Sequence, residues 1–337
     1  MRCGVLIPAY EPGEALPALT RALMDKGVPV VVVNDGSATG LEYFERIRAQ
    51  GAVVLEHGEN LGKGRALKTG LAWMAEQGYE GVVTADADGQ HSLEDILRVA
   101  RALAGGSRRL VLGIRDVSRM PNRSRTGNCL TRTLFRLLYG IKLQDTQTGL
   151  RGIPLTGENR SGLLSLTGER YEYEMEMLIE AGELFPAGIQ ELEIETIYLE
   201  DSDTSSHFRP LADGARIYSV LFRHFPRFFL SSILAFLVDY SLFNLLYYLL
   251  FHRSVPAAVL ARVVSAGVNY TVNRKLVFGS SYHLLGYVKI CLVILLAGSG
   301  LMYLLVDCLS LPAFLVKPLV DCGLYVLSFA AQNRMAQ

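Results

Sequence analysis

Four long apolar stretches dominate the last third of the chain and limit what it can fold into. They cover residues 229–251, 255–272, 284–306 and 311–331. Each is close to the ~20 residues with which an α-helix crosses the hydrocarbon core of a bilayer. The alternative is that the four stretches form core helices of a soluble domain. A small domain has too little interior to bury all of them. The sequence therefore predicts an all-α transmembrane domain of four helices within residues 229–337.

The composition of the whole chain indicates a second, soluble part. Half of the 337 residues are apolar, yet 20% are charged, and a single uniform globule rarely combines the two. We expect the soluble part at residues 1–211, followed by an amphipathic, basic juxtamembrane helix at 212–228. The 33 basic residues balance the 33 acidic ones. Because nucleic-acid-binding proteins usually carry a basic excess, no nucleic acid partner is expected.

Basic residues near the ends of the apolar stretches predict the orientation in the membrane. One side of the membrane would carry Arg216, Arg223, Arg227, Arg274, Lys275 and Arg334, and the other side only Arg253. By the positive-inside rule, the soluble part and both termini are then cytosolic. The chain enters a strand almost at its first residue, so no secretory signal peptide is expected. These features predict a multi-pass protein of the cytoplasmic (inner) cell membrane.

The soluble part alternates apolar, β-branched runs with helical stretches. The predicted strands lie at residues 4–8, 30–33, 52–55, 81–85 and 109–115, with a last, edge-type strand at 194–198. Helices are expected at 16–26 and 92–103, among others. This alternation is typical of a Rossmann-like α/β fold with a mostly parallel sheet covered on both faces. In such sheets, ligands bind at the carboxyl ends of the strands.

Two carboxylates stand at such a strand end. Asp86 and Asp88 directly follow the strand at 81–85. Acidic side chains one residue apart can share Mg²⁺ or Mn²⁺, whose shell is completed by water and phosphate oxygens. An acidic turn without a metal is the alternative. The helix start at 60–68 adds glycines and Lys63, which is a pattern typical of a phosphate site.

Taken together, the strand-end loops resemble a known family. The matching segments are Pro8-Ala9-Tyr10-Glu11, Val33-Asn34-Asp35-Gly36-Ser37, Asn60-Leu61-Gly62-Lys63-Gly64 and Asp86-Ala87-Asp88-Gly89-Gln90-His91. In this order and spacing they resemble the GT-A domain of glycosyltransferase family 2, and within it the polyprenyl-phosphate hexosyltransferases such as dolichyl-phosphate mannose synthase. Four ordered matches over about ninety residues are hard to obtain by chance.

The resemblance implies roles for the donor-binding residues. Asp35 would hydrogen-bond the nucleotide base, and the first loop, with Pro8, Tyr10 and Glu11, would pack around the base and ribose. Asp86 and Asp88 would hold Mg²⁺ or Mn²⁺ on the donor diphosphate. Gln90 stands at the family's position beside the metal.

A basic stretch is the candidate site for the acceptor. Residues 119–136 contain five arginines and no acid, with leucines interleaved at helical spacing. This pattern favours an amphipathic helix on an anionic membrane surface. In the resembling synthases this region receives the phosphate of a lipid acceptor. That implies a role for Arg115 at the preceding strand end, together with Arg123 or Arg125, between which the sequence does not decide.

Two further residues are catalytic candidates. Glu174 lies in the acidic first turn of a helix expected at 171–177, and it would be the general base if the acceptor were a hydroxyl. A phosphate acceptor needs no base, because its second pKa is roughly 6. Arg209 or His207, in a polar loop at 201–210 that could close over the donor, takes the place of the family's lysine, and the sequence does not decide between them. The segment 145–152 matches the family's Asp-x-x-(Ser/Thr)-Gly-(aromatic or Leu)-Arg pattern beneath the active site.

The membrane part carries a resemblance of its own. Asn269-Tyr270-Thr271-Val272-Asn273-Arg274-Lys275-Leu276-Val277-Phe278 resembles the signature of the GtrA-like membrane family, and Phe329-Ala330-Ala331-Gln332-Asn333-Arg334 is a shorter echo of it. The two resemblances imply inverting transfer of a hexose from UDP-glucose or GDP-mannose to a polyprenyl monophosphate at the cytosolic face. A hydroxyl acceptor, or a lipid-linked sugar transporter whose GT-A domain only binds, are the alternatives. The sequence does not decide whether the protein forms a homo-oligomer.

Overall fold

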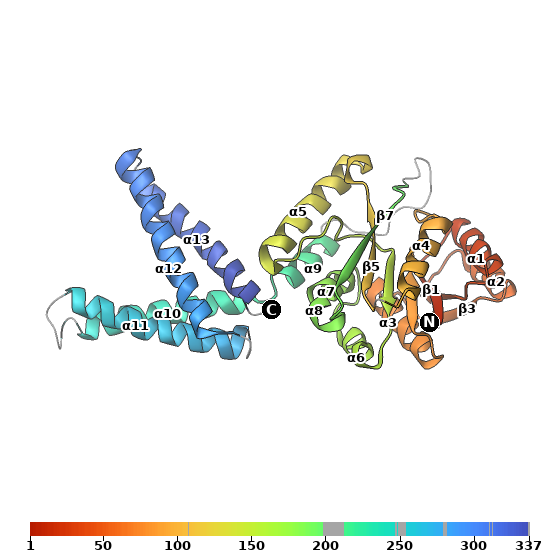
Figure 1. Cartoon of the computed structure of the whole chain (residues 1–337), viewed down its shortest axis with the longest axis horizontal. Helices are drawn as coiled ribbons and strands as arrows, with labels where there is room; N and C mark the ends of the chain where they lie inside the picture. The colour runs from red at the N-terminus through yellow and green to blue at the C-terminus, as the bar shows by residue number, and fades with distance from the viewer. Residues whose placement is uncertain are drawn as a thin grey trace. The chain divides into compact units, whose positions relative to one another are not determined.

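The computed structural model describes residues 1–106, 108–197, 212–246, 248, 254–278, 282–309, 311 and 313–335. The chain divides into two compact units (Figure 1). The first comprises Met1–Leu134 and Lys142–Leu221, and the second comprises Phe135–Ile141 and Phe222–Gln337. After the functions predicted for them from the sequence, we call them the catalytic unit and the membrane unit.

A seven-stranded sheet forms the centre of the catalytic unit. Its strands are β1 (Cys3–Ala9), β2 (Val30–Asp35), β3 (Val53–His57), β4 (Gly81–Thr84), β5 (Leu110–Arg115), β6 (Arg151–Pro154) and β7 (Ile189–Ile194). They are ordered β3-β2-β1-β4-β6-β5-β7. Only β6 runs antiparallel to its neighbours, β4 and β5. The predicted mostly parallel α/β sheet is therefore confirmed, with one reversed strand that the sequence analysis did not identify.

Helices pack on this sheet because its strands are apolar on both faces. Val5, Leu6 and Ile7 of β1 are completely buried. The helices of the catalytic unit are α1 (Ala15–Asp25), α2 (Leu41–Ala49), α3 (Lys63–Glu76), α4 (Leu93–Ala104), α5 (Asn122–Tyr139), α6 (Gly157–Ser165), α7 (Glu172–Ile179), α8 (Ala181–Leu184) and α9 (Ala212–Leu221), with a short turn η1 (Val117–Arg119). Helix α3 packs against β1 and β2, and α4 packs against β4, β5 and β6. These two helices begin in the loops that carry the candidate site.

The last strand lies earlier than the sequence pattern predicted. We expected it at 194–198, but β7 ends at Ile194, and residues 198–211 lie outside the described part of the chain. The reason is the length of its partner. Strand β7 pairs in parallel with β5 from Leu110↔Ile189 to Arg115↔Ile194, so the ladder ends where β5 ends.

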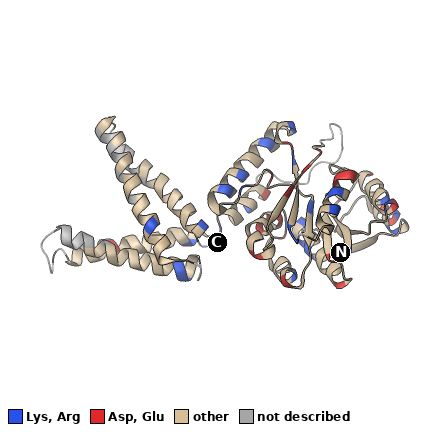
Figure 2. Cartoon of the chain, in the orientation of Figure 1, with Lys and Arg blue, Asp and Glu red and all other residues tan. Residues whose placement is uncertain are grey.

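In its described residues, the membrane unit is helical apart from short connections. Its elements are α10 (Phe225–Leu246), α11 (Ser254–Val272), a π-helical turn η3 (Asn273–Val277), α12 (Leu284–Met302), a second π-helical turn η4 (Tyr303–Cys308) and α13 (Ala313–Met335). Figure 2 shows that these helices carry few charged residues, whereas both signs of charge are spread over the catalytic unit. Among the described residues, only α10 is long and apolar enough to cross a membrane by length and composition, and Leu284–Gly298 is a shorter apolar helix. The number of spans therefore stays a prediction.

The predicted juxtamembrane helix at 212–228 is wrong as a single element. The chain forms α9, which ends at Leu221 and packs against α7, and then starts α10 at Phe225. Pro226 gives the physical reason. A proline in the interior of one long helix would lose a backbone hydrogen bond and clash with the preceding turn, whereas the first turn of a new helix accepts it.

Candidate active site

A lysine between two carboxylates lies at the centre of the candidate site. Asp86 follows β4, Lys63 is the first residue of α3, and Glu174 lies in the first turn of α7. The Lys63 Nζ is 2.7 Å from Asp86 Oδ1 and 3.1 Å from Glu174 Oε2. Only 16% of the Lys63 side chain is exposed. Three elements that are distant in sequence therefore bring predicted site residues into direct contact.

The other side of the Asp86 carboxylate is also occupied. His91 Nε2 lies 3.3 Å from Asp86 Oδ2. A Cβ atom on Gly149 would lie 2.3 Å from the same oxygen, so the backbone there approaches closer than any other residue type allows. Thr84, on β4, fixes this approach by donating a hydrogen bond from Oγ1 to the Gly149 carbonyl at 2.8 Å. The segment 145–152 thus supplies a wall of the site.

Glu174 is held between two cations. Its second oxygen, Oε1, is 3.8 Å from Arg151 Nε, and Arg151 is only 1% exposed. The Arg151 guanidinium also donates to the backbone carbonyls of Glu174 at 2.7 Å and Thr148 at 3.0 Å. Sequence reasoning gave Arg151 no role of its own. The sequence offers one signal for such a role, because an arginine begins the short strand β6. A buried charge at that position requires a buried partner.

These contacts set the protonation of the cluster. Burial by itself would raise the pKa of Asp86, but Lys63 and His91 outweigh it and hold that pKa far below the ordinary value. Burial likewise lowers the pKa of Lys63, and the charges of Asp86 and Glu174 more than reverse this, so the lysine stays protonated. At Asp88, burial and then the charge of Asp86 raise the pKa. The two aspartates of the motif therefore have different environments.

The motif fits a divalent cation that is completed by a substrate. Among the described residues, no three His, Cys, Asp or Glu side chains are grouped as a closed metal site. Asp88 is half-buried, and its Oδ1 accepts the backbone N–H of Gln90 at 3.0 Å. Mg²⁺ is commonly held by one or two carboxylates together with substrate phosphates. Asp86 and Asp88 match that donor set.

Asp35 shapes the loop that precedes Lys63. Its carboxylate accepts the backbone N–H groups of Leu61 at 3.0 Å and Gly62 at 2.8 Å, and it lies 2.8 Å from His57 Nδ1. Only 4% of its side chain is exposed. Asp35 thus fixes the start of α3, a contact that the sequence did not indicate. Its predicted role toward the base stays a prediction.

The first loop is fixed to the loop after β2. Pro8 pairs with Val33 in the parallel ladder of β1 and β2. Beyond the strand, Glu11 has a positive φ of 47° and donates its backbone N–H to Ser37 Oγ at 2.8 Å. Tyr10 and Glu11 are both half-buried. The structure therefore brings the predicted base-binding loops together, although their contacts with a nucleotide stay predictions.

Arg115 contacts a buried aspartate. Its Nε is 2.8 Å and its Nη2 3.2 Å from the two carboxylate oxygens of Asp145, which is fully buried. Asn128, on α5, donates to the same carboxylate at 3.0 Å. Arg115 thereby helps to order the segment that carries Gly149. It also lines a cavity of about 490 Å³, together with Arg119 and Arg132.

The remaining predicted arginines are less well placed by the structure. Arg125 is exposed on α5. Arg123 belongs to the same helix, but its side chain is outside the described part of the structure, as is the whole of Arg209. The choice between Arg123 and Arg125 therefore stays open.

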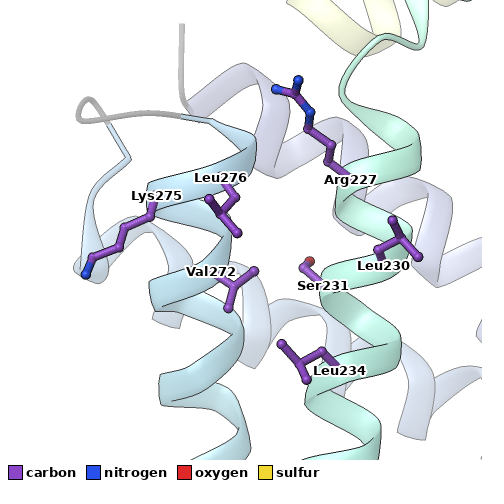
Figure 3. Close-up of a pocket in the computed structure, with 7 residues that line it drawn as sticks. All are labelled: Arg227, Leu230, Ser231, Leu234, Val272, Lys275 and Leu276. Atoms are coloured by element: carbon purple, nitrogen blue, oxygen red, sulfur yellow. The ribbon is translucent and has the colours of Figure 1, made fainter.

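The membrane unit has a groove of its own, of about 600 Å³, between α10 and the end of α11 with η3 (Figure 3). Its lining residues are Arg227, Leu230, Ser231, Leu234, Val272, Lys275 and Leu276. In Figure 3 the Lys275 ammonium points away from the space between the helices. The groove therefore offers mainly aliphatic surface.

Comparisons with known proteins agree with this division. A family model described as Glycosyl transferase family 2 matches residues 4–154, and one described as GtrA/DPMS, transmembrane domain matches residues 227–336. A dolichyl-phosphate N-acetylglucosaminyltransferase of Methanococcus voltae, which uses UDP-N-acetylglucosamine, is 30% identical over 59% of this chain and 86% of its own length. An undecaprenyl-phosphate mannosyltransferase of Micrococcus luteus is 30% identical over 55% of this chain and 79% of its own.

One solved structure is a more distant match. Glucosyl-3-phosphoglycerate synthase of Mycobacterium tuberculosis superposes with a TM-score of 0.49 at 22% identity, over 66% of this chain and 78% of that one.

The fold and the two matched regions define a membrane-attached sugar-transfer enzyme. The chain belongs to glycosyl transferase family 2, and it is a glycosyltransferase with a C-terminal GtrA/DPMS transmembrane domain. The predicted family, enzyme class and membrane attachment are thereby confirmed.

Proposed function

We propose that the enzyme transfers a hexose from a nucleotide diphosphate sugar to a polyprenyl monophosphate, with inversion at the anomeric carbon. The two relatives described above carry dolichyl phosphate and undecaprenyl phosphate in their names, which supports this class of acceptor. Transfer takes place at the cytosolic face of the cytoplasmic membrane, with four spans and both termini cytosolic. The donor is UDP-glucose or GDP-mannose.

The environment of Glu174 is the observation that carries the choice of acceptor. A general base must be free to take a proton from the acceptor hydroxyl within hydrogen-bond reach. Glu174 is 10% exposed and lies against Lys63 on one side and Arg151 on the other. These two cations occupy the surroundings of the carboxylate that an acceptor hydroxyl would have to enter. A lipid phosphate is already anionic at neutral pH, so it needs no base.

The donor end of the reaction requires charge neutralisation. A divalent cation at Asp86 and Asp88 would neutralise charge that develops on the departing diphosphate. Lys63 adds a positive charge at the N-terminus of α3, where backbone N–H groups also favour phosphate. Asp35, Pro8, Tyr10 and Glu11 receive the nucleoside, and Gln90 lies beside Asp88. The role toward the donor that the family resemblance implies for Arg209 stays a prediction.

The acceptor end requires orientation. Arg115, with Arg123 or Arg125, holds the lipid phosphate so that one of its oxygens faces the anomeric carbon. That oxygen forms the new bond to the sugar as the bond to the nucleotide diphosphate breaks, and no proton is transferred. Holding two anions in line for this displacement is the main catalytic task, because positioning alone contributes several kcal/mol, up to roughly 7–11, to such reactions.

The test is transfer of radiolabel from UDP-glucose or GDP-mannose to undecaprenyl phosphate, with the full chain in detergent and Mn²⁺. We expect acid-labile labelled lipid from one donor, and loss of that label when EDTA removes the metal. UDP-N-acetylglucosamine is run as a third donor. No labelled lipid from any donor, or equal labelling of undecaprenol, which lacks the phosphate, would overturn the proposal. The first outcome would favour a binding-only domain and the second a hydroxyl acceptor.

A further inference from the structure

The end of α5 is capped by the end of the chain. Residues Phe135–Ile141 form one compact unit with the membrane-unit helices. Within this unit, Asn333 Nδ2 donates to the Leu138 carbonyl at 2.9 Å. Arg334 donates from Nε to the Leu137 carbonyl at 2.6 Å and from Nη2 to the Arg136 carbonyl at 2.5 Å. Two side chains of α13 thus satisfy three successive carbonyl groups of α5.

Two of these carbonyls, those of Leu137 and Leu138, are groups that the end of a helix leaves unsatisfied, whereas the Arg136 carbonyl also accepts the Gly140 backbone N–H at 3.0 Å. The last four carbonyls of an α-helix have no intrahelical partner, and a cation there also interacts favourably with the helix dipole. Helix α5 is followed by a glycine in the left-handed backbone region, Gly140, with a φ of +76°. The nearest atoms to a Cβ on Gly140 would belong to the Arg334 side chain, at 3.7 Å. The guanidinium therefore lies directly against the helix end.

A buried polar network holds these two residues in place. Gln332 accepts at Oε1 from Asn273 Nδ2, at 3.2 Å, and from the Tyr282 hydroxyl. Asn273 in turn donates to Asn269 at 3.0 Å and accepts from the Ser231 hydroxyl. Asn273, Gln332 and Asn333 are all at most 3% exposed. The motif at 269–278 and its echo at 329–334 thus meet in space, and the echo continues directly into the cap.

Aromatic side chains pack around this network. The Phe329 ring lies 5.1 Å from Phe225, 5.2 Å from Phe228 and 6.4 Å from Phe278, measured between ring centroids. Such aromatic contacts stabilise an arrangement beyond the area that they bury. The position of Asn333 and Arg334 is therefore determined by α10, η3 and α13 together.

We propose that Asn333 and Arg334 are positioning residues, which hold the last turn of α5 to the membrane-unit helices and so restrict the helix that presents arginines to the acceptor. Helix α5 is continuous from Asn122 to Tyr139. Restricting its last turn therefore restricts the earlier turns that carry Arg123 and Arg125. The expected effect on the acceptor rests on the proposed function, whereas the capping of α5 does not depend on it.

The capping is tested first without substrate. Hydrogen exchange is measured by mass spectrometry on the full chain in detergent, for wild type and for Asn333→Ala, Arg334→Ala and Arg334→Lys. We expect peptides covering 136–141 to exchange about tenfold faster in Arg334→Ala, because opening of the last turn becomes easier. Arg334→Lys should restore part of the protection. The matched control is Arg274→Ala, which removes an exposed cation from the same unit. Unchanged exchange in Arg334→Ala would overturn the capping.

The consequence for the acceptor is tested by kinetics. We expect Arg334→Ala to raise the KM for polyprenyl phosphate roughly five- to tenfold, while the KM for the nucleotide sugar stays unchanged. Equal losses toward donor and acceptor would mean a general structural defect and would overturn the positioning role. If the wild type does not use polyprenyl phosphate, the proposed function fails, whereas the exchange result still decides the capping.

Discussion

Two polar clusters, one in each unit, use opposite chemistry. In the catalytic unit, Asp86, Lys63, Glu174 and Arg151 form a chain of full charges. In the membrane unit, Asn273, Gln332 and their partners are neutral amides and hydroxyls that satisfy one another. Both clusters are assembled from segments that are distant in sequence.

The two clusters differ because only the first is expected to bind a charged ligand. A charged cluster costs desolvation energy, and it is useful where a charged ligand will enter and exchange contacts with it. A neutral network inside a membrane domain avoids that cost and still fixes the helices relative to one another. The comparison leads us to expect that changes in the first cluster alter catalysis, whereas changes in the second alter stability and helix position.

The largest effect is expected for Asp88→Ala. Removing this carboxylate takes a ligand away from the proposed metal ion, so transfer should fall by at least roughly 10³-fold while the fold is retained. Initial rates of lipid labelling measure the loss. Glu94→Ala, which removes an exposed acid from the nearby helix α4, is the matched control. Full activity of Asp88→Ala would remove metal-assisted transfer from the mechanism.

A smaller loss is expected for Gly149→Ala. The added Cβ would lie 2.3 Å from Asp86 Oδ2, so the carboxylate or the loop must move. A displacement of about 1 Å can cost on the order of 100-fold in rate. Gly157→Ala serves as the control, since nothing lies within 4 Å of a Cβ at that position. Equal rates for the two variants would show that the contact with Asp86 is not required.

Glu174→Gln should have a modest effect on rate. The amide keeps the shape of the side chain but loses the charge that attracts Lys63, so we expect the KM for the donor to rise and kcat to fall no more than about tenfold. Steady-state kinetics with both substrates varied separates these terms. A loss of kcat beyond roughly 10³-fold, with normal folding, would instead identify Glu174 as a general base and favour a hydroxyl acceptor.

Asn273→Ala should change catalysis least. It removes hydrogen bonds to Ser231, Asn269 and Gln332, and it should lower the free energy of unfolding by about 1–2 kcal/mol. Denaturation in detergent measures this loss. The control is Asn244→Ala, whose side chain donates to the Tyr240 carbonyl of its own helix. If Asn273→Ala lowered kcat as strongly as a change at Asp88, the proposed division between the clusters would be wrong.

Some of the fold was predictable because local patterns determine it. The strand ends after β1, β2 and β4 were located from apolar runs followed by polar loops. The helix expected at 92–103 is also present as α4, whose N-cap Ser92 accepts the Asp95 backbone N–H. The reversed strand β6 was missed, because four residues are too few for a periodic signal. The break between α9 and α10 was also missed, although Pro226 marked it.

The sequence by itself determined the family, the enzyme class, the α/β character of the first part and the apolar nature of the last, because each depends on motifs and periodicities that are local. Only the tertiary structure decided what Asp35, Arg115, Glu174 and Arg151 contact. It also placed the Asn269–Phe278 motif against its echo at 329–334. Such contacts join residues up to about two hundred positions apart, and no local pattern encodes which buried charge or amide will meet which partner.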